Sequence, residues 1–132
     1  MSTTPSLAAG LMQLQALATY VDQGSSNATF IFYDDSKPSS VDVDANTSAA
    51  LVTLTLPKPC FKQLNTDSIE LKQTDAALVT KAGTAIWARL YNGAGFAVAD
   101  FVVGSDISLA NATLVLGATL MMNSIVLKPI TV

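Results

Sequence analysis

The sequence contains no histidine and only one cysteine, Cys60. A Ser-His-Asp triad, a Cys-His pair and a zinc site of histidine and cysteine all need residues that this chain does not supply by itself. A single cysteine also permits no disulfide within the chain, which fits a fold stabilised by packing and synthesis in a reducing cytosol. We therefore expect no catalytic activity, no cofactor and no bound metal.

Charge is also scarce. Charged residues make up 13% of the 132 positions, with 7 lysines and arginines against 10 aspartates and glutamates, for a net charge of −3. The basic residues are scattered and form no stripe, so we expect no nucleic-acid partner. The most apolar stretch, residues 110–127, is interrupted by polar residues and is shorter than the roughly 20 residues that cross a bilayer. From this stretch we expect no transmembrane helix and no membrane partner. The N-terminus lacks the basic flank of a secretory signal, so we also expect no signal peptide.

Apolar residues, by contrast, account for 50% of the chain. That share excludes disorder caused by low hydrophobicity, and the length fits one domain with one core. So many apolar residues with so few charges in a small chain indicate that some faces are covered by another subunit. We expect a homo-oligomer.

One amphipathic helix is predicted between residue 6 and about residue 22, because apolar residues recur there at spacings of three and four. Pro5 precedes the segment and Gly24 follows it, as helix start and stop signals do. The apolar face must be buried on the protein's own sheet or on a neighbouring subunit. It is our candidate assembly contact and consists of Leu7, Leu11, Leu14 and Leu17. We divide the chain into an N-terminal helix or arm, residues 1–24, and a single β-sandwich domain, residues 25–132.

The rest of the chain has the pattern of short strands separated by turns. Strands are predicted at residues 28–33, 49–56, 68–73, 84–91, 96–103 and 107–109, with one or two more within 113–127, where we expect a break near Gly117 or Asn123. For residues 84–91 we place the set Thr84, Ile86, Ala88 and Leu90 toward the core, in preference to Ala85, Trp87, Arg89 and Tyr91. Roughly seven or eight strands after one helix predict an antiparallel β-sandwich or barrel-like domain.

A β-hairpin is predicted where Asn92-Gly93-Ala94-Gly95 joins the runs 84–91 and 96–103. An Asn-Gly pair between two such runs is a strong hairpin signal. We expect Asn92, Gly93 and Gly95 to form the turn, with positive φ at both glycines.

The loop that covers residues 36–48 is poor in large apolar side chains, and we expect it to be mobile. It contains Asp42, Asp44 and Asn46 at alternate positions, as at the start of a calcium loop. Thr47 and Thr53 stand where an EF-hand needs glycine and glutamate, so the signal is weak. The sequence leaves open whether a cation lies near Asp42 and Asp44.

Two other features each have two interpretations. Lys58 and Lys62 flank Cys60 and favour a reactive thiol, but a small buried residue is the preferred interpretation. The aromatic pairs Trp87/Tyr91 and Phe96/Phe101 suggest a sugar-stacking platform, although aromatic residues in a small sandwich more often supply core or interface area.

Residues 81–105, KAGTAIWARLYNGAGFAVADFVVGS, resemble a pattern in small structural proteins of tailed bacteriophages. Those proteins share an A-x-G-x-A-x-W-x-R strand, a glycine turn and a V-x-D return strand. The earlier helix and strand ending in Tyr33-Asp-Asp-Ser-Lys-Pro38 are similar to their Y-x-G-x-x-P opening, with Asp34-Asp35 in place of the glycine.

The resemblance implies a non-enzymatic virion protein, made in the bacterial host cytoplasm. A capsid decoration protein or a neck or collar component would act by self-association and by binding other virion proteins of the shell or connector. The alternative is a receptor- or carbohydrate-binding module of a phage tail, which would use the 36–48 loop and the aromatic residues. An enzyme acting through carboxylates is the least favoured hypothesis.

Overall fold

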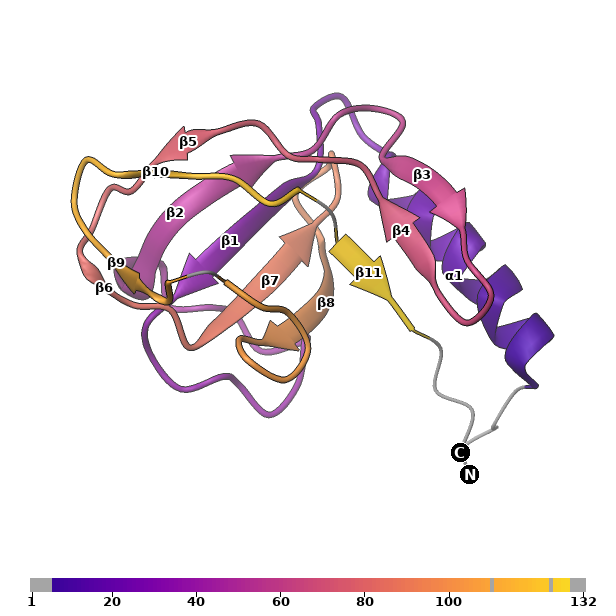
Figure 1. Ribbon diagram of the computed structural model, residues 1–132, viewed down its shortest axis with the longest axis horizontal. Helices are drawn as coiled ribbons and strands as arrows, with labels where there is room; N and C mark the ends of the chain where they lie inside the picture. The colour runs from indigo at the N-terminus through magenta and orange to yellow at the C-terminus, as the bar shows by residue number, and fades with distance from the viewer. Residues whose placement is uncertain (1–5, 110, 124, 129–132) are drawn as a thin grey trace.

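The computed structural model describes residues 6–109, 111–123 and 125–128. In this part of the chain a single α-helix near the N-terminus is followed by short strands, all of which pair antiparallel (Figure 1). The elements are α1 (Leu7–Val21), β1 (Thr29–Tyr33), the 3₁₀ turn η1 (Thr47–Ala49), β2 (Ala50–Thr55), β3 (Phe61–Leu64), β4 (Ile69–Leu71), β5 (Ala77–Leu78), β6 (Gly83–Thr84), β7 (Trp87–Tyr91), β8 (Ala97–Val102), β9 (Thr113–Leu114), β10 (Thr119–Leu120) and β11 (Ile125–Leu127). The predicted antiparallel, sandwich-like β fold with one N-terminal helix is confirmed.

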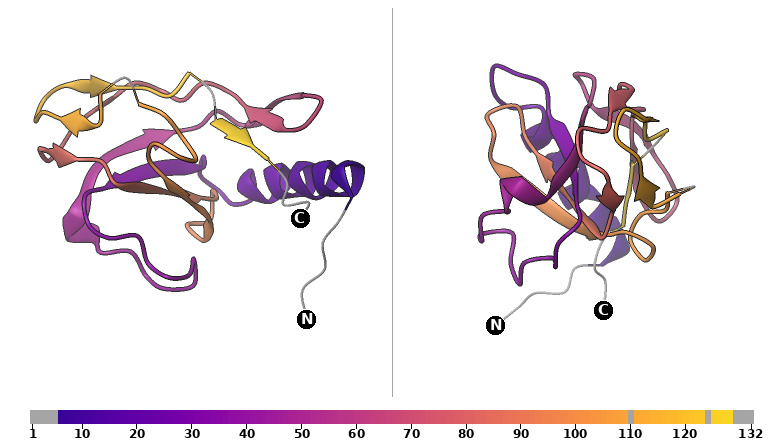
Figure 2. Two further views of the ribbon diagram at one scale, coloured as in Figure 1. Left: turned by 60° about the horizontal axis from the view of Figure 1, so that its bottom comes forward. Right: turned by 90° about the vertical axis from the view of Figure 1, so that its left-hand side faces the viewer.

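The largest sheet, which we call sheet A, has the strand order β2-β1-β7-β8. Its middle strands, β1 and β7, are rich in aromatic and β-branched or bulky residues, which pack well on a pleated surface. A three-stranded sheet, β11-β4-β3, and the short pairs β10-β5 and β6-β9 complete the fold. Figure 2 shows sheet A on one side of the molecule and the strands β4, β5, β10 and β11 on the other. Buried side chains from both sides, such as Phe30 and Ile125, belong to one core cluster.

Helix α1 packs against β3 and β4. Ser6 caps its N-terminus, because the Ser6 side chain accepts a hydrogen bond from the N–H of Ala9 at 3.2 Å. Leu11, Ala18 and Val21 are buried in the same cluster as the side chains of sheet A. Of the two sequence-based alternatives, burial on the protein's own sheet or on a neighbouring subunit, these side chains of the helix take the first and contribute to the core of the β domain.

Strand β7 is buried on both faces, which differs from the prediction. Ala88 and Leu90 lie in the main core as expected, but Ile86 and Thr84 are exposed. Trp87 and Arg89, on the opposite face, are also buried. The reason is that residues 34–49 fold over the outer face of sheet A, where Tyr33, Ala49 and Trp87 form a second small cluster.

Other strand predictions need correction. Residues 107–109 form no strand and contribute only an isolated bridge between Ile107 and Val103. The described residues between 113 and 127 form three short strands, because positive φ at Gly117 turns the chain between β9 and β10. The sequence patterns missed β3 and β5, whose exposed side chains and short length give little periodic signal.

Candidate functional site

A buried ion pair joins β7 to β8. Arg89 and Asp100 are directly opposite in the strand register. The Arg89 Nε donates to Asp100 Oδ1 at 2.6 Å, and Nη2 donates to Oδ2 at 3.0 Å. This bidentate hydrogen bonding with Asp100 raises the pKa of Arg89, which stays charged. The side chains of Arg89 and Asp100 are only 2% and 4% exposed, so each charge is compensated by the other in place of water.

The same guanidinium anchors the loop after β1. Arg89 Nη1 donates to the carbonyl oxygen of Val43 at 2.7 Å, and Nη2 donates to that of Ser40 at 3.4 Å. At the base of the loop, Lys81 lies 3.2 Å from a carboxylate oxygen of Asp34. The loop predicted to be mobile is therefore attached to β7 of sheet A through Arg89, at Ser40 and Val43.

An aromatic stack lies under this loop. The rings of Tyr33 and Trp87 are 4.4 Å apart and nearly parallel, and the Trp87 indole N–H donates to Asp35 Oδ1 at 2.8 Å. The hydroxyls of Tyr33 and Tyr91 are 2.8 Å apart, and burial raises the pKa of Tyr33. Because Trp87 is completely buried, its face is closed to a sugar ring.

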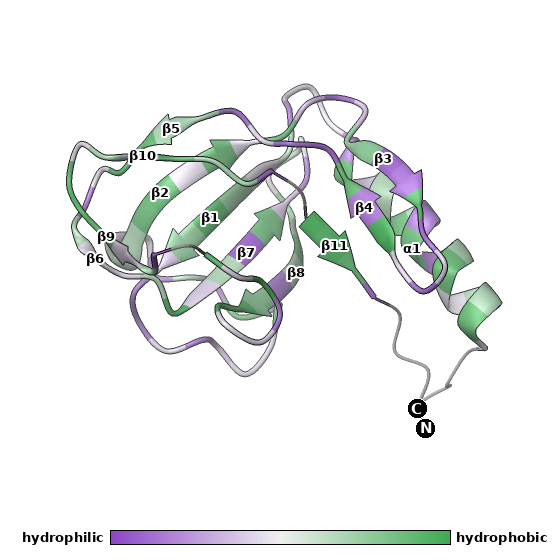
Figure 3. Cartoon of the chain, viewed as in Figure 1, coloured by the Kyte–Doolittle hydropathy of each residue, from purple (hydrophilic) through white to green (hydrophobic). Residues whose placement is uncertain are grey.

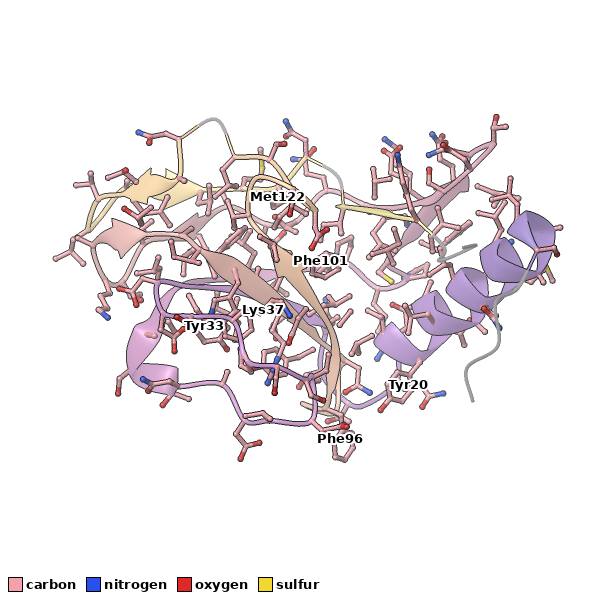
Figure 4. All side chains as sticks on the ribbon, turned by 90° about the horizontal axis from the view of Figure 1, so that it is seen from below. Tyr20, Tyr33, Lys37, Phe96, Phe101 and Met122 are labelled. Carbon is pink, nitrogen blue, oxygen red and sulfur yellow. The ribbon has the colours of Figure 1, made fainter. Side chains whose placement is uncertain are left out.

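The second aromatic pair is divided between surface and interior. Phe96 is 64% exposed, whereas Phe101 is buried. Figure 4 shows Phe96 at the outer margin of the molecule and Phe101 inside it, where its ring lies 5.4 Å from that of Phe30. Phe101 packs in the core, so Phe96 is the one exposed ring of this pair. The two rings therefore do not form a shared flat surface on which a sugar could stack.

The acidic loop residues do not come together as a metal centre. Within the described ranges no group of three or more Asp, Glu, His and Cys side chains is arranged to hold a metal ion. Asn46, the third polar residue of the Asp42/Asp44 pattern, uses its side-chain oxygen to accept from the N–H of Ser48 and so caps η1. Its oxygen has a local structural role.

Cys60 is buried beside the end of α1, as the preferred interpretation holds. Its backbone N–H donates to Asp22 Oδ1 at 3.0 Å, and its Sγ lies 3.6 Å from the carbonyl oxygen of Ala18. Burial, reinforced by the nearby Asp22, raises the pKa of the thiol to about 12. Lys58 and Lys62 contact Gly24 and Glu70 instead, so neither activates the thiol.

The predicted assembly leucines lie in different environments. Leu11 is buried, Leu14 and Leu17 are partly buried against the core, and Leu7 is 43% exposed. The rest of the exposed helix surface carries no charge, because none of the 15 residues of α1 is charged. Its largest exposed side chains are Met12 and Tyr20.

The β7–β8 hairpin forms as predicted, with a difference at one glycine. Asn92 Oδ1 accepts from the N–H groups of Ala94 and Phe96, and Gly95 has φ of 90°. Gly93 has no positive φ. It is needed because a Cβ at this position would collide with the carbonyl oxygen of Ser26. The turn is thus packed tightly against the segment that follows α1.

An apolar tip, not predicted from the sequence, lies at the far end of the molecule. The chain turns at residues 115–118, where the Ala118 N–H donates to the Val115 carbonyl oxygen at 3.0 Å. Val115 and Leu116 are 63% and 65% exposed, and Leu78 on the neighbouring strand β5 is 63% exposed. In Figure 3 the connection between β9 and β10 is coloured as hydrophobic, at the end of the molecule opposite the start of α1. Turns are usually polar. A run of aliphatic residues at a predicted break between strands was therefore the sequence signal that could have revealed this apolar tip.

A groove of about 530 Å³ lies between α1, β8 and β11. Its walls include Leu14 and Leu17 of α1, Phe101 of β8 and Leu127 of β11, with Asp106 and Lys128 also lining it. Two of the predicted assembly leucines therefore face this groove.

Comparisons with protein-family models, curated proteins and solved structures gave no match. No helix in the described part of the chain has both the length and the apolar character needed to cross a bilayer.

Proposed function

We propose that this protein is a non-enzymatic structural component of a tailed-phage virion, a capsid decoration protein or a neck or collar subunit. It would act by self-association and by binding the shell or connector. The resemblance of residues 81–105 to such proteins supports the proposal, and these residues form β6, β7, the turn and β8. The virion is its proposed location, after synthesis in the host cytoplasm.

The observation that carries the proposal is the uncharged exterior of α1. A surface helix normally presents charged residues opposite its buried stripe. Here Met12 is 66% exposed and lies on a helix without a single charge. Such a surface loses little solvation when a partner covers it, because no charge has to leave water.

The apolar tip at Leu78, Val115 and Leu116 adds a second surface of the same kind at the opposite end. Exposed aliphatic side chains that gather at one place mark sites of association. A subunit with two such ends suits an assembled structure, in which every copy meets more than one neighbour.

The residues with chemical capability are engaged in the fold. Arg89 and Asp100 neutralise each other, Trp87 is covered, and the Cys60 thiol is buried. These contacts favour a structural role over catalysis. They also weigh against the alternative receptor- or carbohydrate-binding module, since Trp87 does not reach the surface.

Purified virions of the source phage provide the test. We expect mass spectrometry to detect the chain in the particles, and electron microscopy to place repeated copies of a small β domain with one helix on the head or neck. Absence from purified particles contradicts the proposal. Density at the tail fibre tip favours the receptor-binding alternative.

A further inference from the structure

The outer edge of β8 pairs with no other described strand of sheet A, and it is open before Val102, where the following turn takes over the backbone groups. At the other end of the sheet, β2 is covered, because the N–H groups of Asp75 and Thr80 donate to the carbonyl oxygens of Thr55 and Leu51 at 2.9 Å. Strand β8 pairs only with β7 among the described strands. It is 6 residues long, and the part that precedes Val102 is available for pairing with another strand.

The direction of the outer backbone groups of β8 follows from Val102, whose own groups are bonded to the turn that comes next. Its N–H donates to Asp106 Oδ2 at 2.8 Å and its carbonyl oxygen accepts from the Asp106 N–H at 2.9 Å, so both groups point away from β7. Backbone groups alternate between the two sides of a strand, so those of Asp100 point the same way. Among the described residues no partner is found for the Asp100 N–H on that side.

Strand β8 carries two partial protections of its edge, a bulge at Val98 and the turn at residues 103–107 that occupies the outer backbone groups of Val102, but it carries no charged one. Natural edge strands carry lysine, proline or inward-pointing uncompensated charges that prevent pairing with another chain. Strand β8 has no lysine and no proline, and its one charged side chain, Asp100, is neutralised by Arg89. An approaching strand therefore meets a charge-neutral edge.

The surface beside this edge is complementary to itself. The groove is bounded by the uncharged helix α1, and its two charged lining residues outside β8, Asp106 and Lys128, have opposite signs. A two-fold axis brings the same surface of two copies together, so Asp106 of one copy can face Lys128 of the other. A surface with one acid and one base suits a second copy better than a strongly charged partner.

We propose that β8 pairs antiparallel with β8 of a second copy, so that sheet A continues across a two-fold axis and the groove closes over the contact. This pairing rests on the proposed function, since it names the contact through which the structural subunit associates with itself. The exterior of α1 around Met12 and the apolar tip remain free for the shell or connector.

The first experiment measures association of the full chain by sedimentation equilibrium over a range of concentrations. We expect a monomer–dimer equilibrium that is weakened about tenfold by Lys128→Glu and restored by combining Lys128→Glu with Asp106→Lys. Asp106→Asn removes the charge of this side chain but keeps its structural contact, because the amide oxygen still accepts the hydrogen bond from the Val102 N–H. The exposed residues Lys37 and Asp67 supply matched controls, Lys37→Glu and Asp67→Lys, which should leave the dissociation constant unchanged.

The second experiment follows hydrogen exchange at the Asp100 amide by NMR. We expect fast exchange when the protein is dilute and at least tenfold slower exchange in the dimer, because only the second β8 provides an acceptor. A dimer with an unprotected Asp100 amide and no response to the charge exchange overturns the β8 contact while leaving a self-associating subunit in place. A monomer at every concentration overturns the β8 contact, whereas absence of the chain from virions is what refutes the proposed function.

Discussion

The carbonyl oxygen of Gly93 accepts a hydrogen bond from the N–H of Ser26 at 3.1 Å, and the Ser26 carbonyl oxygen faces the hydrogen atoms of the Gly93 Cα. This close approach fixes the β7–β8 turn against the segment that leaves α1. Any side chain at Gly93 separates the two stretches of backbone.

We therefore expect Gly93→Ala to lower the free energy of unfolding by about 3 kcal/mol, since backbone must move. Gly95→Ala is the comparison, because a Cβ there meets no atom within 4 Å and only the positive φ opposes it. That strain costs about 1 kcal/mol. Urea denaturation of both variants measures the difference, and equal losses would contradict the close-approach explanation.

Removing one partner of the Arg89–Asp100 pair should be costly. Asp100→Ala leaves a buried guanidinium without its carboxylate, so we expect a loss of about 3–5 kcal/mol. Arg89→Met combined with Asp100→Leu should lose less than Asp100→Ala alone, because no buried charge remains. Thermal denaturation of the single and double variants tests this, and a double variant less stable than Asp100→Ala would refute it.

Arg89 also holds the loop after β1 against sheet A through its hydrogen bonds to the loop backbone. In Arg89→Met the carbonyl oxygens of Ser40 and Val43 lose their donor, so we expect faster protease cleavage within residues 36–46. Lys37→Met, which changes an exposed loop residue, should leave the cleavage rate nearly unchanged. Mass spectrometry of the fragments locates the cut, and equal cleavage in both variants would show that Arg89 does not hold the loop.

The Cys60 thiol should make stability fall at high pH. A cysteine thiol in an open chain has a pKa of 9.0, whereas burial raises the pKa of Cys60 to about 12, so the unfolded state loses its proton first. The contribution of the neutral thiol is complete below pH 9 and declines as the pH rises toward 12, by up to about 1.4 kcal/mol per pH unit.

Cys60→Ala provides the reference, because the same Tyr33 titration occurs in both proteins. The difference in unfolding free energy between wild type and Cys60→Ala should shrink as the pH rises above 9 toward 12, as measured by urea denaturation. A constant difference over that range would contradict the burial of the thiol. Reaction with a maleimide near neutral pH should likewise require unfolding.

The loss of stability on truncating a helix leucine to alanine should depend on how deeply that leucine is buried. Leu11→Ala is expected to cost about 2–4 kcal/mol, since it leaves a cavity in the main core. Leu7→Ala should cost less than about 1 kcal/mol because Leu7 is partly in solvent. Similar losses at the two positions, measured by thermal denaturation, would mean that α1 does not dock on β3 and β4 as described.

Local sequence determined the helix and the central hairpin. The spacing of the leucines from Leu7 to Leu17 specifies one helical face, and Asn92 with the positive φ of Gly95 specifies the turn between β7 and β8. Both signals involve residues a few positions apart, so periodicity and turn chemistry suffice to predict them.

Tertiary structure alone decided what covers each face. Trp87 and Arg89 are buried because the chain more than forty positions earlier returns over sheet A, which no local pattern reports. The requirement for glycine at position 93 comes from Ser26, and the open edge of β8 exists because no described strand pairs beyond it. Burial and strand pairing depend on segments distant in sequence, whereas alternation along a strand gives the two faces without saying which of them will be covered.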